Sequence, residues 1–345
     1  MKAILQTRPE RGGIEVGERE RPEPGPDEAL VRVHTAGLCG SDAHAYTYAK
    51  GYEWVPIPRI MGHEYSGEVV EVGEGVTTLS PGDGVVERPI HYCGECFQCN
   101  NGQQNVCRDF EITGMHNDGA YTEYVAVDEA FLHPVPEGLP LGDAAITEPT
   151  SVATRAVLHR SRVAAGDTVL VEGPGPIGVL TAAVADSMGA NVLVSGLSRD
   201  ASYRLPLVEG LGIETVDAER EDLGERTAAA TDGVGFDVVF DTTGHHTGVE
   251  TAAEHVRKGG QVVVVGLPGA ESELFVTDLV RGEVTLDTSY ASTWRDFERA
   301  LRLMENGSID ADAIVDASFD VDDPEAAFEA FLAGETCKPV FRFRG

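Results

Sequence analysis

The chain contains four cysteines within fifteen residues, in the spacing C-x2-C-x2-C-x7-C: Cys93, Cys96, Cys99 and Cys107. Zn²⁺ takes four thiolates at about 2.3 Å in closed structural sites, and a short loop brings them together at little entropic cost. The alternative is two disulfides or four unrelated thiols. We disfavour it because the N-terminus turns polar too soon for a secretory segment. We therefore predict a structural zinc site in a lobe over about residues 88–110, with no open position for substrate.

A second set of metal-binding side chains is spread over three distant segments. Cys39 lies in G-L-C-G-S-D, His63 and Glu64 lie in G-H-E-Y, and Glu148 lies in T-E-P. A single cysteine is by default a small buried hydrophobe, and a single histidine is an ordinary polar residue. Together, one thiolate, one imidazole and carboxylates suit a catalytic zinc that keeps a position open for substrate.

A glycine-rich turn at residues 173–178, with the sequence G-P-G-P-I-G, follows a continuous apolar strand at 167–172. A helix over 179–188 and a strand over 191–195 come next. Strand, G-x-G-x-x-G, helix and strand form the dinucleotide-binding fingerprint in its required context. The glycines let the backbone approach a pyrophosphate, and the helix N-terminus supplies a positive dipole end.

The elements around these motifs predict two domains in 345 residues. Short alternating strands, among them 69–73 and 120–127, and Gly/Pro turns dominate the first 150 residues. Apolar strands at 236–241 and 261–266 then alternate with helices, as in a doubly wound parallel sheet. Helices at 294–306 and 324–333 and a strand at 340–343 are expected to return to the first domain. We predict a β-rich domain over 1–151 and 291–345 and a nucleotide-binding domain over 152–290.

Charge and hydropathy exclude several functions. The chain has 58 acidic and 26 basic residues and a net charge of −32, the wrong sign for binding nucleic acid. No apolar run reaches about eighteen residues, so we expect no membrane span. The acids interleave with apolar periodicity, and we interpret them as an adaptation to high salt, where the Debye length falls to about 3 Å at 1 M. The alternative is a merely acidic enzyme. The predicted compartment is the cytoplasm, where thiols stay reduced.

In their order along nearly the whole chain, these motifs resemble the zinc-dependent medium-chain alcohol and polyol dehydrogenases: G-x-C-G-S-D, G-H-E-x-x-G-x-V, the four-cysteine lobe, E-P and G-x-G-x-x-G. The resemblance implies an α/β chain in which a GroES-like β domain, in two sequence segments, flanks a Rossmann doubly wound parallel-sheet domain. It places the active site in the cleft between them.

The resemblance also implies roles for single residues around the catalytic zinc. Cys39 and His63 are the expected ligands, and Glu148 resembles the third ligand of the polyol and threonine branches, where the classical branch has cysteine. Glu64 is expected as an auxiliary carboxylate that exchanges with water on the metal. Asp42 is expected to hydrogen-bond His63 and fix its tautomer.

For proton transfer, the resemblance assigns Ser41 to the substrate hydroxyl. It places His44 at the outer end of a relay that runs through the cofactor ribose. An exposed loop histidine is the alternative for His44.

The cofactor-binding residues also follow from the resemblance. Lys338 is expected to face the pyrophosphate, with a solvated lysine as the alternative. The others expected at the dinucleotide are Gly173, Gly175, Pro176, Ile177, Gly178, Thr243, Gly266 and Leu267.

Cofactor preference depends on the end of the second strand of the nucleotide-binding sheet. An acid there binds the ribose 2′-hydroxyl of NAD, but this chain has Gly196. Ser198, Arg199 or Arg204 could bind a 2′-phosphate. We therefore predict that NADP is accepted and preferred. The alternative is that Asp200 takes the acid's role and NAD wins.

The leading functional hypothesis is oxidation of a secondary alcohol, polyol or sugar hydroxyl with NAD(P). L-threonine 3-dehydrogenase is one alternative, because Trp54 near G-H-E-Y is similar to that branch, and an aldose 1-dehydrogenase is another. A cofactor-binding sensor without catalysis is the non-enzyme alternative. Homodimers or homotetramers are expected from the resemblance, with residues 284–286 extending the sheet across a two-fold axis.

Overall fold

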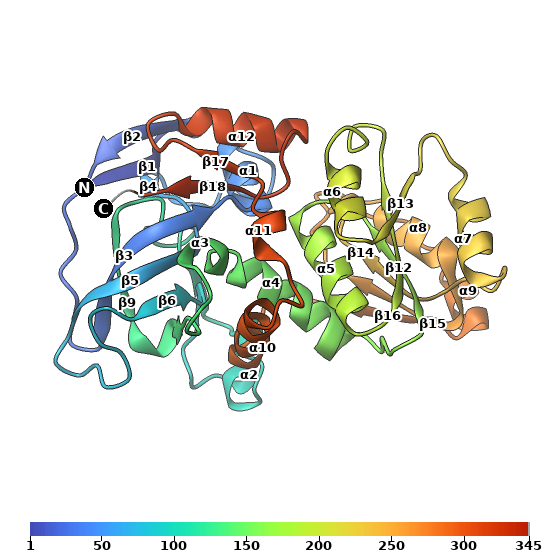
Figure 1. The fold of residues 1–345 in the computed structure, drawn as a ribbon, viewed down its shortest axis with the longest axis horizontal. Helices are drawn as coiled ribbons and strands as arrows, with labels where there is room; N and C mark the ends of the chain where they lie inside the picture. Colours follow the sequence, from blue (N-terminus) through green and yellow to red (C-terminus); the bar gives the residue numbers. More distant parts are fainter. Residues whose placement is uncertain (344–345) are drawn as a thin grey trace. The chain divides into compact units, whose positions relative to one another are not determined.

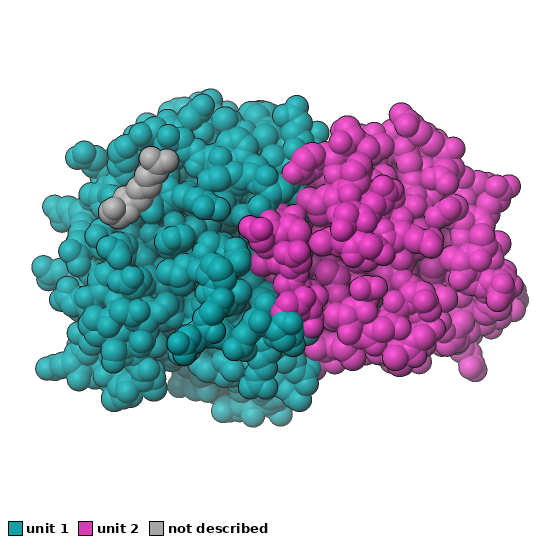
Figure 2. All heavy atoms as spheres, viewed as in Figure 1, with its two compact units in different colours: residues 1–148, 293–306, 315–345 teal, residues 149–292, 307–314 magenta. Residues whose placement is uncertain are grey.

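The computed structural model describes residues 1–343, which divide into two compact units (Figures 1 and 2). Unit 1 comprises residues 1–148, 293–306 and the described chain from 315 onward; unit 2 comprises 149–292 and 307–314. The main boundaries lie within three residues of those predicted. Residues 307–314 differ from the prediction, because they belong to unit 2 and not to the returning C-terminal segment.

The main sheet of unit 1 has seven strands and is built from segments distant in sequence. Its order is β10-β6-β5-β3-β18-β17, with β9 also pairing with β3. Alternation in β3 buries Val31 and Val33 in a shared core with Tyr65 and Phe341. The strands are β3 (Glu28–Gly37), β5 (Glu64–Val72), β6 (Gly84–Glu87), β9 (Tyr124–Asp128), β10 (Leu132–Pro134), β17 (Ala317–Phe319) and β18 (Pro339–Arg342).

The C-terminal strand returns to the first domain, as predicted. β18 lies antiparallel to β3, with Val340 opposite Gly37, which brings Lys338 close to the segment that carries Cys39. The smaller strands of unit 1 are β1 (Lys2–Gln6), β2 (Ile14–Glu18), β4 (Arg59–Ile60), β7 (Ile90–His91) and β8 (Glu111–Ile112). Its helices are α1 (Gly40–Tyr46), α2 (Phe97–Asn100), α3 (Leu141–Ala144), α10 (Trp294–Glu305) and α12 (Pro324–Ala333), with 3₁₀ turns at Gln104–Val106 and Glu129–Phe131.

Unit 2 is organised around a six-stranded sheet in which every pairing is parallel. Its order, β13-β12-β11-β14-β15-β16, reverses direction beside β11, and ligands bind outside the carboxyl ends of strands at such a switch point. The strands are β11 (Thr168–Glu172), β12 (Asn191–Gly196), β13 (Glu214–Asp217), β14 (Phe236–Asp241), β15 (Val256–Val264) and β16 (Thr285–Thr288).

Helices connect these strands. α5 packs on β11 and β12, and α8 packs on β14 and β15. The helices are α5 (Pro176–Ser187), α6 (Arg204–Gly210), α7 (Leu223–Thr231), α8 (Gly248–His255), α9 (Val276–Gly282) and α11 (Ala311–Ile314); α4 (Thr147–Arg155) crosses the unit boundary and ends in a π turn, Ala156–Arg160. Among residues 1–343, no helix combines the length and the apolar character that crossing a bilayer requires.

Candidate metal centres and cofactor loops

The four lobe cysteines form a cluster with the dimensions of a tetrahedral metal site. The Sγ–Sγ distances are 3.5 Å for Cys96–Cys99, 3.8 Å for Cys96–Cys107 and 3.5 Å for Cys107–Cys93. A ZnS₄ tetrahedron with bonds of about 2.3 Å has edges of about 3.8 Å, whereas a disulfide bond is about 2.0 Å long. All four thiols are free, so the disulfide alternative does not hold in this structure.

The backbone of the lobe favours thiolates. Backbone N–H groups, first that of Arg108 and then that of Cys99, lower the pKa of the Cys96 thiol to about 6. Cys107 Sγ accepts from the N–H groups of Cys93 and Asp109, each at 3.4 Å. The donor set therefore fits zinc, although burial raises the pKa of Cys99 to about 12, so that four thiols would not all ionise without a cation.

Cys39, His63 and Glu64 form a second cluster in unit 1. One ligand atom from each lies within 4.8 Å of the others, although the residues come from different segments. Cys39 is the N-cap of α1, and Glu64 is the first residue of β5. Strand β5 therefore begins five residues before the predicted start at Val69, and this extension fixes the backbone that carries the carboxylate.

The surroundings of His63 fit a cation. Burial lowers the pKa of His63, but the negative groups of Asp42, Cys39 and Glu148 outweigh it and leave that pKa well above its usual value. His63 Nδ1, Asp42 Oδ1 and Glu64 Oε1 are buried and have no hydrogen-bond partner among the described residues. A buried excess of anionic donors with unpaired polar atoms is the condition that a bound metal ion relieves.

The imidazole of His63 presents different nitrogens to its two neighbours. Nδ1 lies 3.7 Å from Asp42 Oδ1, which is longer than a hydrogen bond. The two atoms face each other, but the predicted hydrogen bond is not formed in this structure. Nε2 lies 3.4 Å from Ser41 Oγ. The arrangement leaves Nε2 for a metal and places the serine hydroxyl beside the metal-facing nitrogen. His44 is exposed on α1, and its ring stacks on Tyr52 at 5.1 Å.

Glu148 is partly buried in unit 1, and its carboxylate is not among the atoms that meet within 4.8 Å. Burial and then the charge of Glu64 raise the pKa of Glu148 to about 7, while His63 and Lys338 lower it. These interactions place its carboxyl near the cluster. The cluster thus contains Glu64, the predicted auxiliary carboxylate, and the role of Glu148 as third ligand stays a prediction.

Lys338 lies beside the metal cluster, and its contact with the pyrophosphate stays a prediction. Its side chain is buried, and its ammonium donates to the carboxylate of Glu64 and, at 3.0 Å, to the carbonyl oxygen of Leu38. It is therefore not a solvated lysine, because it is buried and its ammonium is directed at the metal cluster. The pairing follows from strand β18, which places Lys338 beside β3 and β5.

The glycine-rich turn of unit 2 is shaped for a dinucleotide. A Cβ at Gly178 would lie 1.8 Å from the carbonyl oxygen of Gly173, so the third glycine allows α5 to approach β11. A Cβ at Gly175 would meet no protein atom within 4 Å, which leaves open the side from which a phosphate approaches. Pro176 is the first residue of α5, where its missing N–H costs nothing, and Ile177 follows it.

The other predicted cofactor residues lie on loops at the carboxyl ends of the same parallel strands. Thr243 follows β14, and its hydroxyl donates to Asp241 Oδ1 at 2.7 Å. Gly266 and Leu267 follow β15, and a Cβ at Gly266 would lie 2.3 Å from the backbone nitrogen of Gly244. The structure therefore brings three predicted segments to one edge of the sheet.

The loop after β12 holds Ser198 and Arg199, and Arg204 is the first residue of α6. The Ser198 hydroxyl donates to Asp217 at 3.0 Å, and Arg204 lies 3.7 Å from the buried Asp200. The guanidinium of Arg199 is 73% exposed. The carboxylate of Asp200 accepts a hydrogen bond from the backbone N–H of Leu197 at 3.1 Å. This bond stabilises the turn over residues 197–200.

Comparison with known proteins identifies the family. The alcohol dehydrogenase GroES-like domain matches residues 25–137, and the zinc-binding dehydrogenase domain matches residues 176–306. Sorbitol dehydrogenase of Halalkalibacterium halodurans is 35% identical over 341 residues, 98% of each chain. The chain belongs to the zinc-binding alcohol dehydrogenase family.

Two further relatives match this dehydrogenase over its whole length. L-threonine 3-dehydrogenase of Pyrococcus furiosus is 34% identical and covers 100% of this chain and 99% of its own. The crystal structure of a zinc-binding dehydrogenase from Sinorhizobium meliloti 1021, bound to NADP, has a TM-score of 0.91 at 31% identity and covers 99% of both chains. The predicted fold class is confirmed, and the protein is a zinc-dependent oxidoreductase that uses a nicotinamide dinucleotide.

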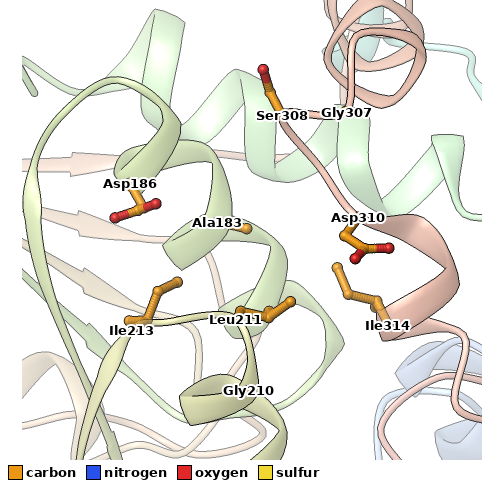
Figure 3. A pocket seen from close by; sticks show the side chains of 9 residues that line it. All are labelled: Ala183, Asp186, Gly210, Leu211, Ile213, Gly307, Ser308, Asp310 and Ile314. Carbon is orange, nitrogen blue, oxygen red and sulfur yellow. The ribbon is translucent and has the colours of Figure 1, made fainter.

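A pocket of about 260 Å³ in unit 2 lies away from the cofactor loops. Figure 3 shows the segment 307–314 facing the later turns of α5 and the end of α6 across this pocket. Ala183 and Asp186 lie two to three turns beyond the glycine-rich turn, so the pocket is not the dinucleotide site. It marks where the late segment packs on the nucleotide-binding unit and explains why residues 307–314 belong there.

Sequence reasoning missed one residue of this dehydrogenase's metal site. Tyr121 was included only as part of a strand predicted over 120–127, but β9 begins at Tyr124. The side chain of Tyr121 instead lies behind His63, against Gly62 and Asp42. The signal available in the sequence was a polar aromatic residue beside two small ones, which is too weak to assign a role.

Proposed function

We propose that this dehydrogenase oxidises a secondary alcohol group of a polyol or sugar, with NADP⁺ as the preferred acceptor. The observation that carries the proposal is the cluster of Cys39, His63 and Glu64, with the Ser41 hydroxyl beside the metal-facing nitrogen of His63. The relatives named sorbitol dehydrogenase and 2R,3R-butanediol dehydrogenase support a secondary alcohol.

In this proposal Cys39 and His63 hold one zinc ion, with Glu64 and Glu148 as the carboxylates available to it. The four lobe cysteines hold a second, structural ion. Bound zinc supplies the Lewis acidity that lowers the pKa of an alcohol hydroxyl, and the nicotinamide accepts the hydride. A metal content of about two zinc ions per chain is therefore expected. A content of about one, without turnover, would favour the sensor alternative.

The chain's own residues position the alcohol and remove its proton. The Ser41 hydroxyl accepts a hydrogen bond from the substrate hydroxyl and passes the proton outward. His44 is exposed, and burial of part of its ring lowers its pKa, so the imidazole is neutral near pH 7 and can take up a proton. Lys338 donates to the carboxylate of Glu64 and thereby fixes its orientation within the cluster.

The proposed preference for NADP rests on the loop after β12. Gly196 ends the strand at the position where an acid would bind the ribose of NAD, and a Cβ there would lie 2.8 Å from Leu205 Cδ2, so Leu205 would have to move to admit a larger side chain. Asp200 accepts from Leu197 and lies 3.7 Å from Arg204 and 4.0 Å from Arg199, and the 73% exposed side chain of Arg199 is the one proposed to meet a 2′-phosphate. A clear kinetic preference for NAD would contradict this proposal, and Arg199→Ala should reduce kcat/KM for NADP more than for NAD.

The deciding experiment is a substrate panel of polyols, aldoses, simple alcohols and L-threonine, each with NADP and NAD at molar salt. Highest kcat/KM for a polyol or other secondary alcohol supports the proposal. Highest kcat/KM for L-threonine would make the enzyme a threonine 3-dehydrogenase, the alternative that the Pyrococcus relative favours. Oxidation of an aldose at its anomeric carbon would make it an aldose 1-dehydrogenase.

The proposed assembly is a homodimer or homotetramer. β16 is an edge strand of the unit 2 sheet, and Leu286 on it is exposed. Phe275, the N-cap of α9, and Val280 on α9 are each 71% exposed, so exposed apolar side chains accompany an open sheet edge. A second copy pairing its own β16 would cover both. Light scattering should give a multiple of the 36.7 kDa chain mass; a monomer would contradict the proposal.

The proposed setting is a salt-rich cytoplasm. Thiolate-rich zinc sites form where cysteines stay reduced, and all six cysteines of the chain are free in this structure. The net charge of −32 is tolerated when salt screens it.

A further inference from the structure

Tyr121 is a buried phenol directed at Asp42. Its side chain has no exposed surface, and its hydroxyl lies 2.9 Å from Asp42 Oδ2 and 3.0 Å from the carbonyl oxygen of Gly37. A phenol has one proton to donate, and the carboxylate is the stronger acceptor because that bond is charge-assisted. The hydroxyl therefore donates to Asp42.

The two oxygens of Asp42 have different partners. Oδ2 accepts from Tyr121 and from the backbone N–H of Cys39, at 3.2 Å. Oδ1 has no hydrogen-bond partner among the described residues and lies 3.7 Å from His63 Nδ1. Two donors on Oδ2 fix the rotation of the carboxylate and thereby direct Oδ1 at the imidazole.

The ring of Tyr121 is itself held in place. Gly62 has a φ of +91°, and a Cβ there would lie 2.2 Å from Tyr121 Cδ1, so the ring fills the space that glycine leaves. The backbone N–H of Tyr121 donates to Met61 at 2.8 Å, and the ring packs edge-on against Phe341 at 5.0 Å. The phenol oxygen is therefore a fixed point against which Asp42 is oriented.

We propose that Tyr121 is a positioning residue for the catalytic metal. Its hydroxyl fixes Asp42, and the Asp42 Oδ1 so directed faces His63 Nδ1 at 3.7 Å, which leaves Nε2 for the metal. The inference rests on the metal site proposed above. A phenylalanine ring would fill the space behind Gly62 equally well, so the hydroxyl alone carries the effect. Loss of the residue that contacts a metal-binding histidine weakens metal binding by about 10- to 100-fold. We expect about tenfold here, because Tyr121 contacts Asp42 and not His63 itself.

The test is the release of zinc from full-length Tyr121→Phe protein to a chromogenic chelator. Zinc from the Cys39 cluster should leave about tenfold faster than in the unsubstituted chain. Zinc in the four-cysteine lobe is an internal control and should leave at the same rate in both proteins. Tyr46→Phe is a matched control, because Tyr46 is also buried and its hydroxyl donates to a carboxylate, Glu329 at 2.8 Å, that touches no proposed metal ligand.

A double variant shows whether Tyr121 acts through Asp42. In an Asp42→Asn background, Tyr121→Phe should cause no further change in release. An unchanged release in the single variant, an equal acceleration in Tyr46→Phe, or full additivity in the double variant would overturn the inference. An unsubstituted chain that retains lobe zinc alone would overturn the proposed function instead.

With Co²⁺ in place of zinc, a shifted ligand-field spectrum in Tyr121→Phe would support the positioning role, and an identical spectrum would refute it.

Discussion

Glu172 is a buried carboxyl group immediately before the glycine-rich turn. It is 3% exposed, and neither of its side-chain oxygens has a hydrogen-bond partner among the described residues. It ends β11 and lies in register with Asp241 on β14. Burial and then the charges of Asp241 and Glu254 raise the pKa of Glu172 to about 9 from 4.5. Glu172→Gln keeps the shape of the side chain and removes its ionisation.

The sign and size of the effect follow from that pKa. Between about pH 4.5 and about pH 9 the folded chain holds a proton on Glu172 that the unfolded chain has released, so stability falls as pH rises through this window. The slope for one proton is about 1.4 kcal/mol per pH unit. From about pH 6 to about pH 8, the unsubstituted protein should lose about 2 to 3 kcal/mol of unfolding free energy relative to Glu172→Gln. Relaxation around the buried charge makes this an upper value.

The assay is urea unfolding of both proteins at several pH values in molar salt, followed by far-UV circular dichroism. Tryptophan fluorescence is unsuitable, because both tryptophans, Trp54 and Trp294, lie in unit 1 whereas Glu172 lies in unit 2. Burying an amide shifts Glu172→Gln by a constant amount at every pH, so the slope is the informative quantity. Glu214→Gln, at the exposed start of β13, is the control and should show no change of slope. A difference between the proteins that stays constant with pH would refute the reasoning.

Three other predictions use the same structure. Gly178→Ala should raise the Kd for NADP at least tenfold with zinc content unchanged, because its Cβ would lie 1.8 Å from the carbonyl oxygen of Gly173. The Cβ of Gly175→Ala would meet no protein atom, so weaker NADP binding by that variant would report contact with the cofactor itself. An unchanged Kd for NADP in both variants would contradict the role of the turn. Lys338→Met should lower the unfolding free energy of the zinc-free protein by about 3 kcal/mol in urea melts, because it leaves Glu64 buried and unpaired. Adding Glu64→Gln should restore most of that loss. No recovery in the double variant would contradict the pairing. Thermal melts should give a higher Tm in molar KCl than in dilute buffer, where the net charge of −32 repels itself, and equal values would contradict adaptation to salt.

Local patterns allowed much of the fold to be predicted. The strand before Gly173 and the helix after it are short-range features, and both lie within three residues of their predicted bounds. The lobe cysteines were predictable because fifteen residues of chain contain the whole site. By contrast, β5 was predicted too short, since its first residues carry the polar side chains of the metal cluster and break the alternation of a half-buried strand.

Long-range contacts were not predictable from the sequence. The partners Lys338 and Glu64 are 274 positions apart, and their pairing depends on the register of β18 against β3 and of β3 against β5. The hydroxyl of Tyr121 reaches Asp42 across 79 positions for a similar reason. Residues 307–314 look like a connecting loop in sequence, and their place in unit 2 emerges only from packing against α5 and α6.

The late return of residues 307–314 has a consequence for engineering. The chain passes between its units at four places: 148/149, 292/293, 306/307 and 314/315. A chimera that takes only residues 149–292 from a relative would keep residues 307–314 of this chain. These eight residues would then pack on a nucleotide-binding unit from the other parent. Grafts should therefore carry 307–314 with the module, or confine the exchange to the loop after β12.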